Sequence, residues 1–183
     1  VMPFEETQNT DTPLTIYAAT KKASESMAHS YAHLWNLPVT MFRFFTVYGP
    51  YGRPDMALFK FTKGIVEGTP IDIYNNGDMY RDFTYIDDLV LSIKKLISQI
   101  PGKSLNKVCN DSLSAVAPYR IVNIGNSDKV QLLAFIEAIE NELGITAIKN
   151  FMPMQEGDVP ATWADASLLE NLTGFRPNTS YKQ

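Results

Sequence analysis

Apolar residues recur at helical spacing in the stretch that ends near residue 35. Asp11, Thr12 and Pro13 precede this stretch and read as a helix start, with a polar side chain to cap backbone amides and a proline at an early position. The apolar positions are three, four or seven residues apart and form one stripe: Ile16, Ala23, Met27, Tyr31 and Leu34. The pattern therefore predicts a long amphipathic helix, ended by the Leu37-Pro38 pair.

Shorter elements of both kinds are predicted along the rest of the chain. Branched and aromatic residues at 39–45 indicate a buried strand, and the Gly- and Pro-containing segment VYGPYGRPD after it indicates a loop. Further helices are expected at 56–67, 86–99 and 130–143, the last closed by Gly144, and further strands at 71–74, 82–85, 120–124 and 146–151. The polar segment 101–118 is expected to be a mobile surface loop. Alternating helices and strands predict an α/β fold.

Composition and charge narrow the class of protein and of partner. The chain has 183 residues, of which 45% are hydrophobic and 20% are charged, as is typical of a soluble globular domain. Its net charge of -4 provides no basic field that would attract a phosphate backbone. No apolar run approaches the roughly 18 residues of a membrane-spanning helix. We therefore expect neither nucleic acid nor a membrane as a partner.

The cysteine content bears on the cellular location of the protein, and the two ends of the chain bear on whether it is a fragment. Cys109 is the single cysteine, so no disulfide can form within the chain, and a reducing cytoplasm is the expected location. The chain lacks an initiator Met, and its last residues, TSYKQ, read as the approach to another element. We expect a fragment of a longer protein.

Tyr17 and Lys21, in the segment YAATK, are the first candidates for chemistry. Their spacing of four residues places them on one face of the predicted helix. A phenol is a poor base at neutral pH, but a neighbouring ammonium group favours the phenolate. The same spacing is common by chance, so an exposed helix pair without a catalytic role is the competing interpretation.

Three other patterns are better explained by structure than by chemistry. His29 and His33 have the spacing of a metal pair, but no third ligand accompanies them, so we expect a surface or packing role and no metal site. Asp87 and Asp88 are expected to cap the helix that starts near residue 86. The aromatic residues Tyr74, Tyr80, Phe83 and Tyr85 could stack on a base, yet aromatic residues on strands usually pack in a core.

Several longer segments occur in an order that resembles one enzyme family. They are YAATKKASESMAHSY, RFFTVYGPYGRPDMALFKF, IYNNGDMYRDFTYIDD, and PYRIVNIGN with MQEGDV. In this order they resemble the signature blocks of extended short-chain dehydrogenase/reductase enzymes, and within that family they are most similar to UDP-glucuronate 4-epimerases. The resemblance runs from about residue 14 to residue 165, and the blocks around the Gly/Pro loop and RDFTYIDD are much more specific than the Tyr and Lys pair.

The resemblance implies NAD as cofactor and defines two catalytic roles. Tyr17 would take the proton from the sugar 4-hydroxyl while a hydride passes to NAD, which gives a 4-keto sugar. Lys21 would hold the nicotinamide ribose and keep Tyr17 acidic. Because the hydride later returns to the other face of the sugar, NAD would be regenerated rather than consumed.

The resemblance also implies four residues that bind the UDP-sugar. Thr46 and Arg53 would contact the sugar C6 carboxylate, a task that suits the planar donor fork of arginine. Arg81 would bind the diphosphate, and Asp158 would accept hydrogen bonds from the nucleotide ribose. Outside the resemblance, Arg53 and Arg81 would each read as an ordinary exposed charge.

By resemblance, the chain is the carboxyl-terminal portion of such an enzyme. Residues 1–52 would complete the NAD-binding Rossmann domain, and residues 53–183 would mainly form the substrate domain, with some segments returning to the Rossmann part. The sequence contains no GxGxxG loop, so the phosphate-binding turn and the catalytic Ser or Thr are expected upstream of Val1. The chain alone is therefore expected to be inactive. A homodimer is expected, packed through Ala19 and Ala23 of the Tyr17 helix.

Two other functions remain open at this point. UDP-glucuronate decarboxylases and nucleotide-sugar 4,6-dehydratases use the same Tyr and Lys pair and differ in residues expected upstream of Val1. A non-catalytic fragment that only binds a nucleotide sugar is the alternative from another class. The joint presence of the Tyr and Lys pair with Thr46, Arg53 and Arg81 argues against it.

Overall fold

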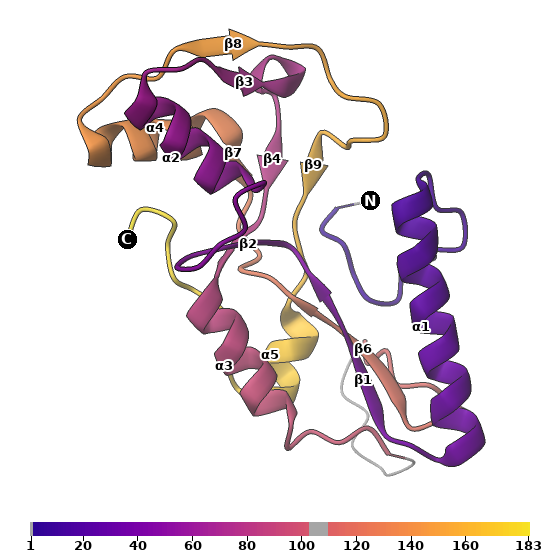
Figure 1. Ribbon diagram of the computed structural model, residues 1–183. Coiled ribbons are helices and arrows are strands. Elements are labelled where there is room, and N and C mark those ends of the chain that lie inside the picture. The colour runs from indigo at the N-terminus through magenta and orange to yellow at the C-terminus, as the bar shows by residue number, and fades with distance from the viewer. Residues whose placement is uncertain (1, 103–109) are drawn as a thin grey trace.

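Two parallel strands, β1 (Val39–Phe44) and β6 (Tyr119–Ile124), form the lower part of the molecule in Figure 1. The computed structural model describes residues 2–102 and 110–183, so Cys109 and the middle of the predicted 101–118 loop lie outside it. Helix α1 (Ile16–Trp35) covers one face of this strand pair, and helices α3 (Ile86–Leu96) and α5 (Ser167–Thr173) lie on the other face. The pair is thus the middle layer of an α/β/α sandwich.

The upper part is built around a second apolar core. Helices α2 (Ala57–Glu67) and α4 (Leu132–Leu143) pack against each other, next to the parallel pair β3 (Ile71–Ile73) and β8 (Lys149–Phe151) and the short turn η1 (Tyr74–Gly77). Phe83 and Phe135 stack at its centre, with ring centroids 4.0 Å apart and planes 4° apart. Flat stacking of two buried rings ties α4 to the strand that carries Phe83.

Very short strands connect the two parts. Strand β4 (Tyr80–Arg81) lies between β7 (Val130–Gln131) and β9 (Ala161–Thr162), antiparallel to the first and parallel to the second. Strand β2 (Thr46–Tyr48) pairs in parallel with β5 (Phe83–Tyr85). These pairings bring segments from the whole length of the chain to the junction between the upper and lower parts (Figure 1).

The structure confirms the α/β fold and the four predicted helices, and it corrects several boundaries. Helix α1 begins at Ile16 rather than near Pro13, because the cap is Thr15, whose hydroxyl accepts a hydrogen bond from the Ala18 amide at 3.1 Å. Asp11 instead forms an ion pair with Lys22 at 3.1 Å.

Boundaries of two other helices also differ from the predicted ones. Helix α3 ends at Leu96, three residues before the predicted end, and the first two residues predicted for α4 form strand β7 because they pair with β4. Gly144 closes α4 in the left-handed conformation, as predicted. The short elements β2, β4, β9 and α5 had not been predicted.

The apolar stripe of α1 faces away from the β1–β6 pair. Ile16, Met27, Tyr31 and Leu34 are 83%, 59%, 57% and 68% exposed. The helix packs on the strands through its opposite face, where Ala28 and Ala32 meet Tyr119. The predicted stripe is therefore present but is not part of the core of this chain. None of the helices in the described ranges is long and apolar enough to cross a membrane.

Candidate active site

Tyr17 and Lys21 lie together near the start of α1, on an open surface. The Lys21 ammonium is 5.2 Å from the centre of the Tyr17 ring, within the range of a cation–π contact. Tyr17 is 72% exposed, so a ligand can reach its hydroxyl. Thr15 fixes the start of the helix two residues earlier, which sets the direction in which the Tyr17 side chain leaves the backbone.

Arg53 lies in the loop after β2, where its guanidinium is already paired with a carboxylate. Its Nε donates to Asp55 Oδ1 at 3.0 Å, and its Nη2 donates to Asp55 Oδ2. These hydrogen bonds lower the pKa of the Asp55 carboxyl and raise that of Arg53. The Tyr17 phenol makes a further, smaller contribution that raises the pKa of Arg53.

Arg81 and Asp158 form an ion pair between β4 and the segment that precedes β9. Arg81 Nη2 donates to Asp158 Oδ1 at 2.9 Å, while its Nη1 donates to the Tyr80 carbonyl at 2.9 Å. The Arg81 side chain is only 18% exposed, and this burial lowers its pKa, against the opposing effect of Asp158. A half-buried guanidinium of this kind is suited to hold an anion.

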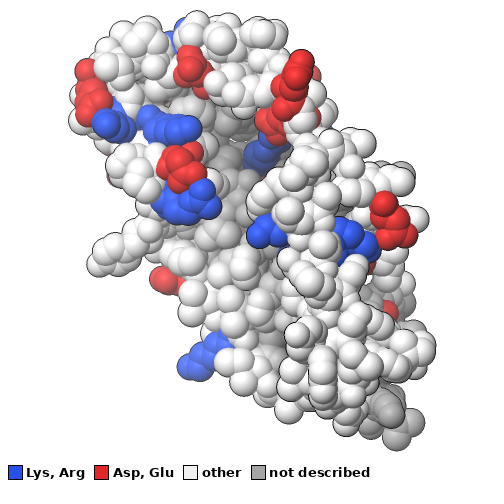
Figure 2. All heavy atoms as spheres, turned by 45° about the vertical axis from the view of Figure 1, so that its right-hand side comes forward, with Lys and Arg blue, Asp and Glu red and all other residues white. Residues whose placement is uncertain are grey.

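The segment that carries Asp158 also reaches the start of α1. Gly157 has φ = +81°, and a Cβ atom there would lie 3.2 Å from the Thr15 methyl carbon. The Thr46 amide donates to the carbonyl of Asp82, the residue that follows Arg81, at 3.0 Å. The structure thus forms two pairs, Tyr17 with Lys21 and Arg81 with Asp158, and the contacts of Gly157 and Thr46 link the second pair to the start of α1 and to β2. Arg53 lies in the loop that follows β2. Figure 2 shows Lys and Arg side chains beside a hollow in this face of the molecule.

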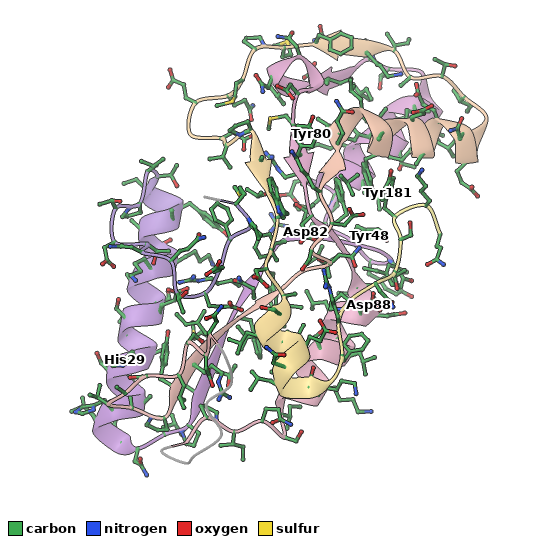
Figure 3. All side chains as sticks on the ribbon, turned by 180° about the vertical axis from the view of Figure 1, so that it is seen from behind. His29, Tyr48, Tyr80, Asp82, Asp88 and Tyr181 are labelled. Atoms are coloured by element: carbon green, nitrogen blue, oxygen red, sulfur yellow. The ribbon has the colours of Figure 1, made fainter. Side chains whose placement is uncertain are left out.

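Asp82 is a buried residue of this region that sequence reasoning missed. Its side chain, labelled in Figure 3, is fully buried and accepts hydrogen bonds from the amides of Asn126, Ser127 and Ala164 at 2.8, 2.9 and 3.1 Å. Burial raises the pKa of Asp82, and the three amide hydrogen bonds oppose this rise. The sequence placed Asp82 only at the start of a strand, and nothing local shows that distant amides converge on it.

Glu6 is a second buried acid that was missed. Its Oε1 accepts the Asn123 amide at 2.8 Å, and burial raises the pKa of its carboxyl. Close by, the Phe4 amide donates to the Trp163 carbonyl at 3.0 Å. The segment before α1 is therefore fastened both to β6 and to the residues that follow β9.

The other patterns noted in the sequence have ordinary partners. His29 hydrogen-bonds to Ser114 at 2.9 Å, and His33 to the Val116 carbonyl at 2.8 Å. Within residues 2–102 and 110–183, no three His, Cys, Asp or Glu side chains are grouped so that they could hold a metal ion. Asp87 and Asp88 lie in the first turn of α3, but Tyr85 is its N-cap and makes no side-chain cap bond. Asp88 instead accepts the amides of residues 178 and 179 at 3.0 and 2.8 Å.

Comparisons of the sequence with a family model and with known proteins agree with one another. The sequence model of the NAD dependent epimerase/dehydratase family matches residues 1–110. The chain is 56% identical over 186 residues to a probable UDP-glucuronate 4-epimerase of Rhizobium meliloti (strain 1021), covering 100% of this chain and 54% of that protein. It is 44% identical over 182 residues to UDP-glucuronate 4-epimerase 1 of Arabidopsis thaliana, covering 97% and 42%. The chain thus spans about half the length of these curated relatives or less.

Solved structures show the same relationship. The chain superposes on UDP-glucuronic acid 4-epimerase from Bacillus cereus, in complex with UDP-glucuronic acid and NAD, with a TM-score of 0.79 at 30% identity. The matched region covers 98% of this chain and 54% of that one. Because the family model matches more than half of the sequence, the chain belongs to the NAD dependent epimerase/dehydratase family.

Proposed function

We propose that this chain is part of an NAD-dependent UDP-glucuronate 4-epimerase, which interconverts UDP-glucuronic and UDP-galacturonic acid through a 4-keto sugar. The relatives that support this are about twice as long, so the activity is proposed for a longer protein that contains the chain. The observation that carries the proposal is the combination of an exposed Tyr and Lys pair at the start of α1 with two arginines that each already hold a carboxylate.

The exposed pair on α1 fits the role of proton transfer beside a dinucleotide. Tyr17 offers a hydroxyl that can accept and return a proton, and Lys21 offers three N–H donors suited to ribose hydroxyls. When bound, NAD would supply the group that accepts a hydride from the sugar and gives it back. Tyr17 would take the proton from the sugar 4-hydroxyl and return it, while Lys21 would orient the ribose and favour the phenolate.

Arg53 and Thr46 would bind the C6 carboxylate of the sugar. Asp55 now grips the Arg53 fork with both carboxylate oxygens, which is the arrangement that a uronic acid would make. Both partners of this ion pair are exposed, so a ligand carboxylate can replace Asp55 at small cost. A sugar without a carboxylate would gain nothing at this position, and this favours a uronic acid.

Arg81 would bind the diphosphate and Asp158 the nucleotide ribose. A diphosphate would take over the guanidinium N–H that Asp158 now accepts, which frees the carboxylate for ribose hydroxyls. In domain terms, we propose that residues 1–52 belong to the NAD-binding part and residues 53–183 mainly to the substrate part. The packing of α3, β6 and α5 around β1 supports the return of later segments to the first part.

A homodimer is proposed as the assembled form. The exposed apolar stripe of α1, which includes Ala23, offers an interface, and Ala19 lies on the same helix. Small side chains allow two helices to approach closely, while Met27 and Leu34 would supply apolar area.

The test uses the longer gene product that contains this chain, with NAD and UDP-glucuronic acid, followed by proton NMR of the sugar nucleotides. UDP-galacturonic acid should appear, and Tyr17→Phe should abolish it. The matched control is Tyr31→Phe, which removes the hydroxyl of an exposed tyrosine on the same helix that has no proposed catalytic role and keeps its ring in the apolar stripe, so it should retain activity. A pentose or a 4-keto product would instead indicate a decarboxylase or dehydratase, and binding without turnover would indicate a non-catalytic protein.

A further inference from the structure

Strand β4 is too short to fix the place of Arg81 by its own hydrogen bonds. The strand consists of Tyr80 and Arg81, and each of its neighbours, β7 and β9, also has two residues. Two paired residues on each side leave a ladder that can slip or fray, because strands this short are marginal without further support. The Arg81–Asp158 pair nevertheless requires that β4 and β9 keep their register.

The Asp82 carboxylate ties both neighbours of β4 at their ends. Its Oδ1 accepts the amide of Asn126, and its Oδ2 accepts the amide of Ser127, in the turn that leads into β7. Its Oδ2 also accepts the amide of Ala164, two residues after the end of β9. One side chain therefore fastens β7 and β9 to the residue next to Arg81, on a fully buried carboxylate where hydrogen bonds are strong.

Two further contacts show how closely this junction is fitted. A Cβ atom on Gly125 would lie 2.7 Å from Asp82 Oδ2 and 2.6 Å from the Ala164 Cβ, so a larger residue cannot occupy position 125 without displacing them. The main-chain carbonyl of Asp82 accepts the Thr46 amide at 3.0 Å. The residue thus meets the segments that carry three of the candidate ligands: Thr46, Arg81 and Asp158.

We propose that Asp82 is a positioning residue, which holds the Arg81 guanidinium opposite Asp158 and thereby sets the affinity for a nucleoside diphosphate. The effect on affinity rests on the proposed function of Arg81, whereas the positioning of Arg81 by Asp82 does not. Asp82 itself is fully buried, so its carboxylate is not accessible to a ligand. If its carboxylate is lost, β7 and β9 keep only backbone hydrogen bonds to β4 and its neighbours, among them Tyr80 to Pro160 and Leu132 to Met79, both at 2.8 Å. The guanidinium is then held less firmly opposite Asp158.

The test compares Asp82→Asn with a control of equal burial. Asparagine keeps the shape of the side chain but turns an NH2 group toward at least one amide donor. At least one hydrogen bond is therefore replaced by a repulsive contact between two N–H groups. The control is Asp111→Asn, whose carboxylate is also buried and accepts Arg120 Nε at 2.9 Å near the start of β6. A second variant, Gly125→Ala, keeps the Asp82 charge and displaces it by steric contact.

Two readouts on the longer gene product that contains this chain separate positioning from binding. The first is the side-chain guanidinium resonance of Arg81 in nitrogen-edited NMR without ligand, assigned by its absence in Arg81→Lys. A guanidinium held by Asp158 should rotate slowly and give a distinct signal. The second is the dissociation constant for UDP, measured by calorimetry below the melting temperature of each variant.

Asp82→Asn and Gly125→Ala should lose the distinct Arg81 signal and weaken UDP binding by about tenfold or more, as a displaced binding group does. Asp111→Asn should lower the melting temperature but keep both the distinct Arg81 signal and the affinity for UDP. A retained Arg81 signal in Asp82→Asn, or the same losses in Asp111→Asn, overturns the proposal. If the unsubstituted longer protein does not bind UDP while Asp82→Asn still loses the signal, the positioning role stands and the proposed diphosphate role of Arg81 fails.

Discussion

At the scale of single residues, burial decides which acidic side chains matter for stability. Glu6 is 8% exposed, and its pKa is raised by burial, assisted by Asp165 and opposed by the Asn123 amide and by Arg43. A raised pKa means that the folded state binds the proton more tightly than the unfolded state. The penalty of the ionised carboxyl is therefore absent below the ordinary value of 4.5 and grows as the pH rises through the raised value.

This argument predicts a pH-dependent difference between the native chain and Glu6→Gln, which keeps the acceptor for Asn123. The native chain should lose stability relative to the variant as the pH rises from 4 toward 7, by about 1.4 kcal/mol for each unit by which the pKa is raised. Urea unfolding at a series of pH values measures the difference. A difference that stays constant across this range would mean that Glu6 titrates normally in the fold.

Two Asp–Arg pairs with the same bidentate geometry should differ sharply in their contribution to the free energy of unfolding. Asp111 and Arg120 are buried, with side chains 0% and 6% exposed, whereas Arg53 and Asp55 are 75% and 58% exposed. Removing one partner of a buried pair strands the other charge, so Asp111→Ala should lower the free energy of unfolding by about 3–5 kcal/mol. Asp55→Ala should leave it almost unchanged. Chemical denaturation of both variants checks this, and equal losses would contradict it.

At the scale of elements, two residues before α1 could cap its first turn. Thr15 makes the cap bond to Ala18, while Asp11, which the sequence favoured, makes an exposed ion pair with Lys22. Thr15→Ala should therefore cost about 1 kcal/mol of unfolding free energy, and Asp11→Ala clearly less. Thermal unfolding of the two variants decides between the caps, and a larger loss for Asp11→Ala would restore the predicted start.

Elements were predictable where a periodic pattern is long enough to be read. Helices α2 and α4 were found within two residues, because each repeats its apolar positions over several turns and a left-handed glycine follows each of them. Strands β4, β7 and β9 have two residues each and carry no period, so only their pairing defines them. The resemblance supplied the six candidate residues, but Asp82 was missed because its three backbone amide donors come from residues 44 to 82 positions away.

At the scale of the whole molecule, α1 presents two faces to two different neighbours. Ala28 and Ala32 lie against the β1–β6 pair, whereas the stripe of Ile16, Met27 and Leu34 remains exposed. An apolar stripe over five turns of a helix is larger than the scattered apolar residues of an ordinary surface, and such patches mark interaction sites. Periodicity alone could not reveal this, because it shows that a stripe exists and not what covers it.

If the stripe pairs two copies of the chain, a charge at its centre should separate them. Burying Met27 in an interface contributes about 1.5–3 kcal/mol, and a lysine there would lose this and add the cost of a desolvated ammonium. Sedimentation velocity should therefore show a dimer for the native chain and a monomer for Met27→Lys at the same concentration. Met154→Lys, the same change at a residue 43% exposed and outside the stripe, should remain a dimer. A native chain that sediments as a monomer would contradict the homodimer proposal for this chain.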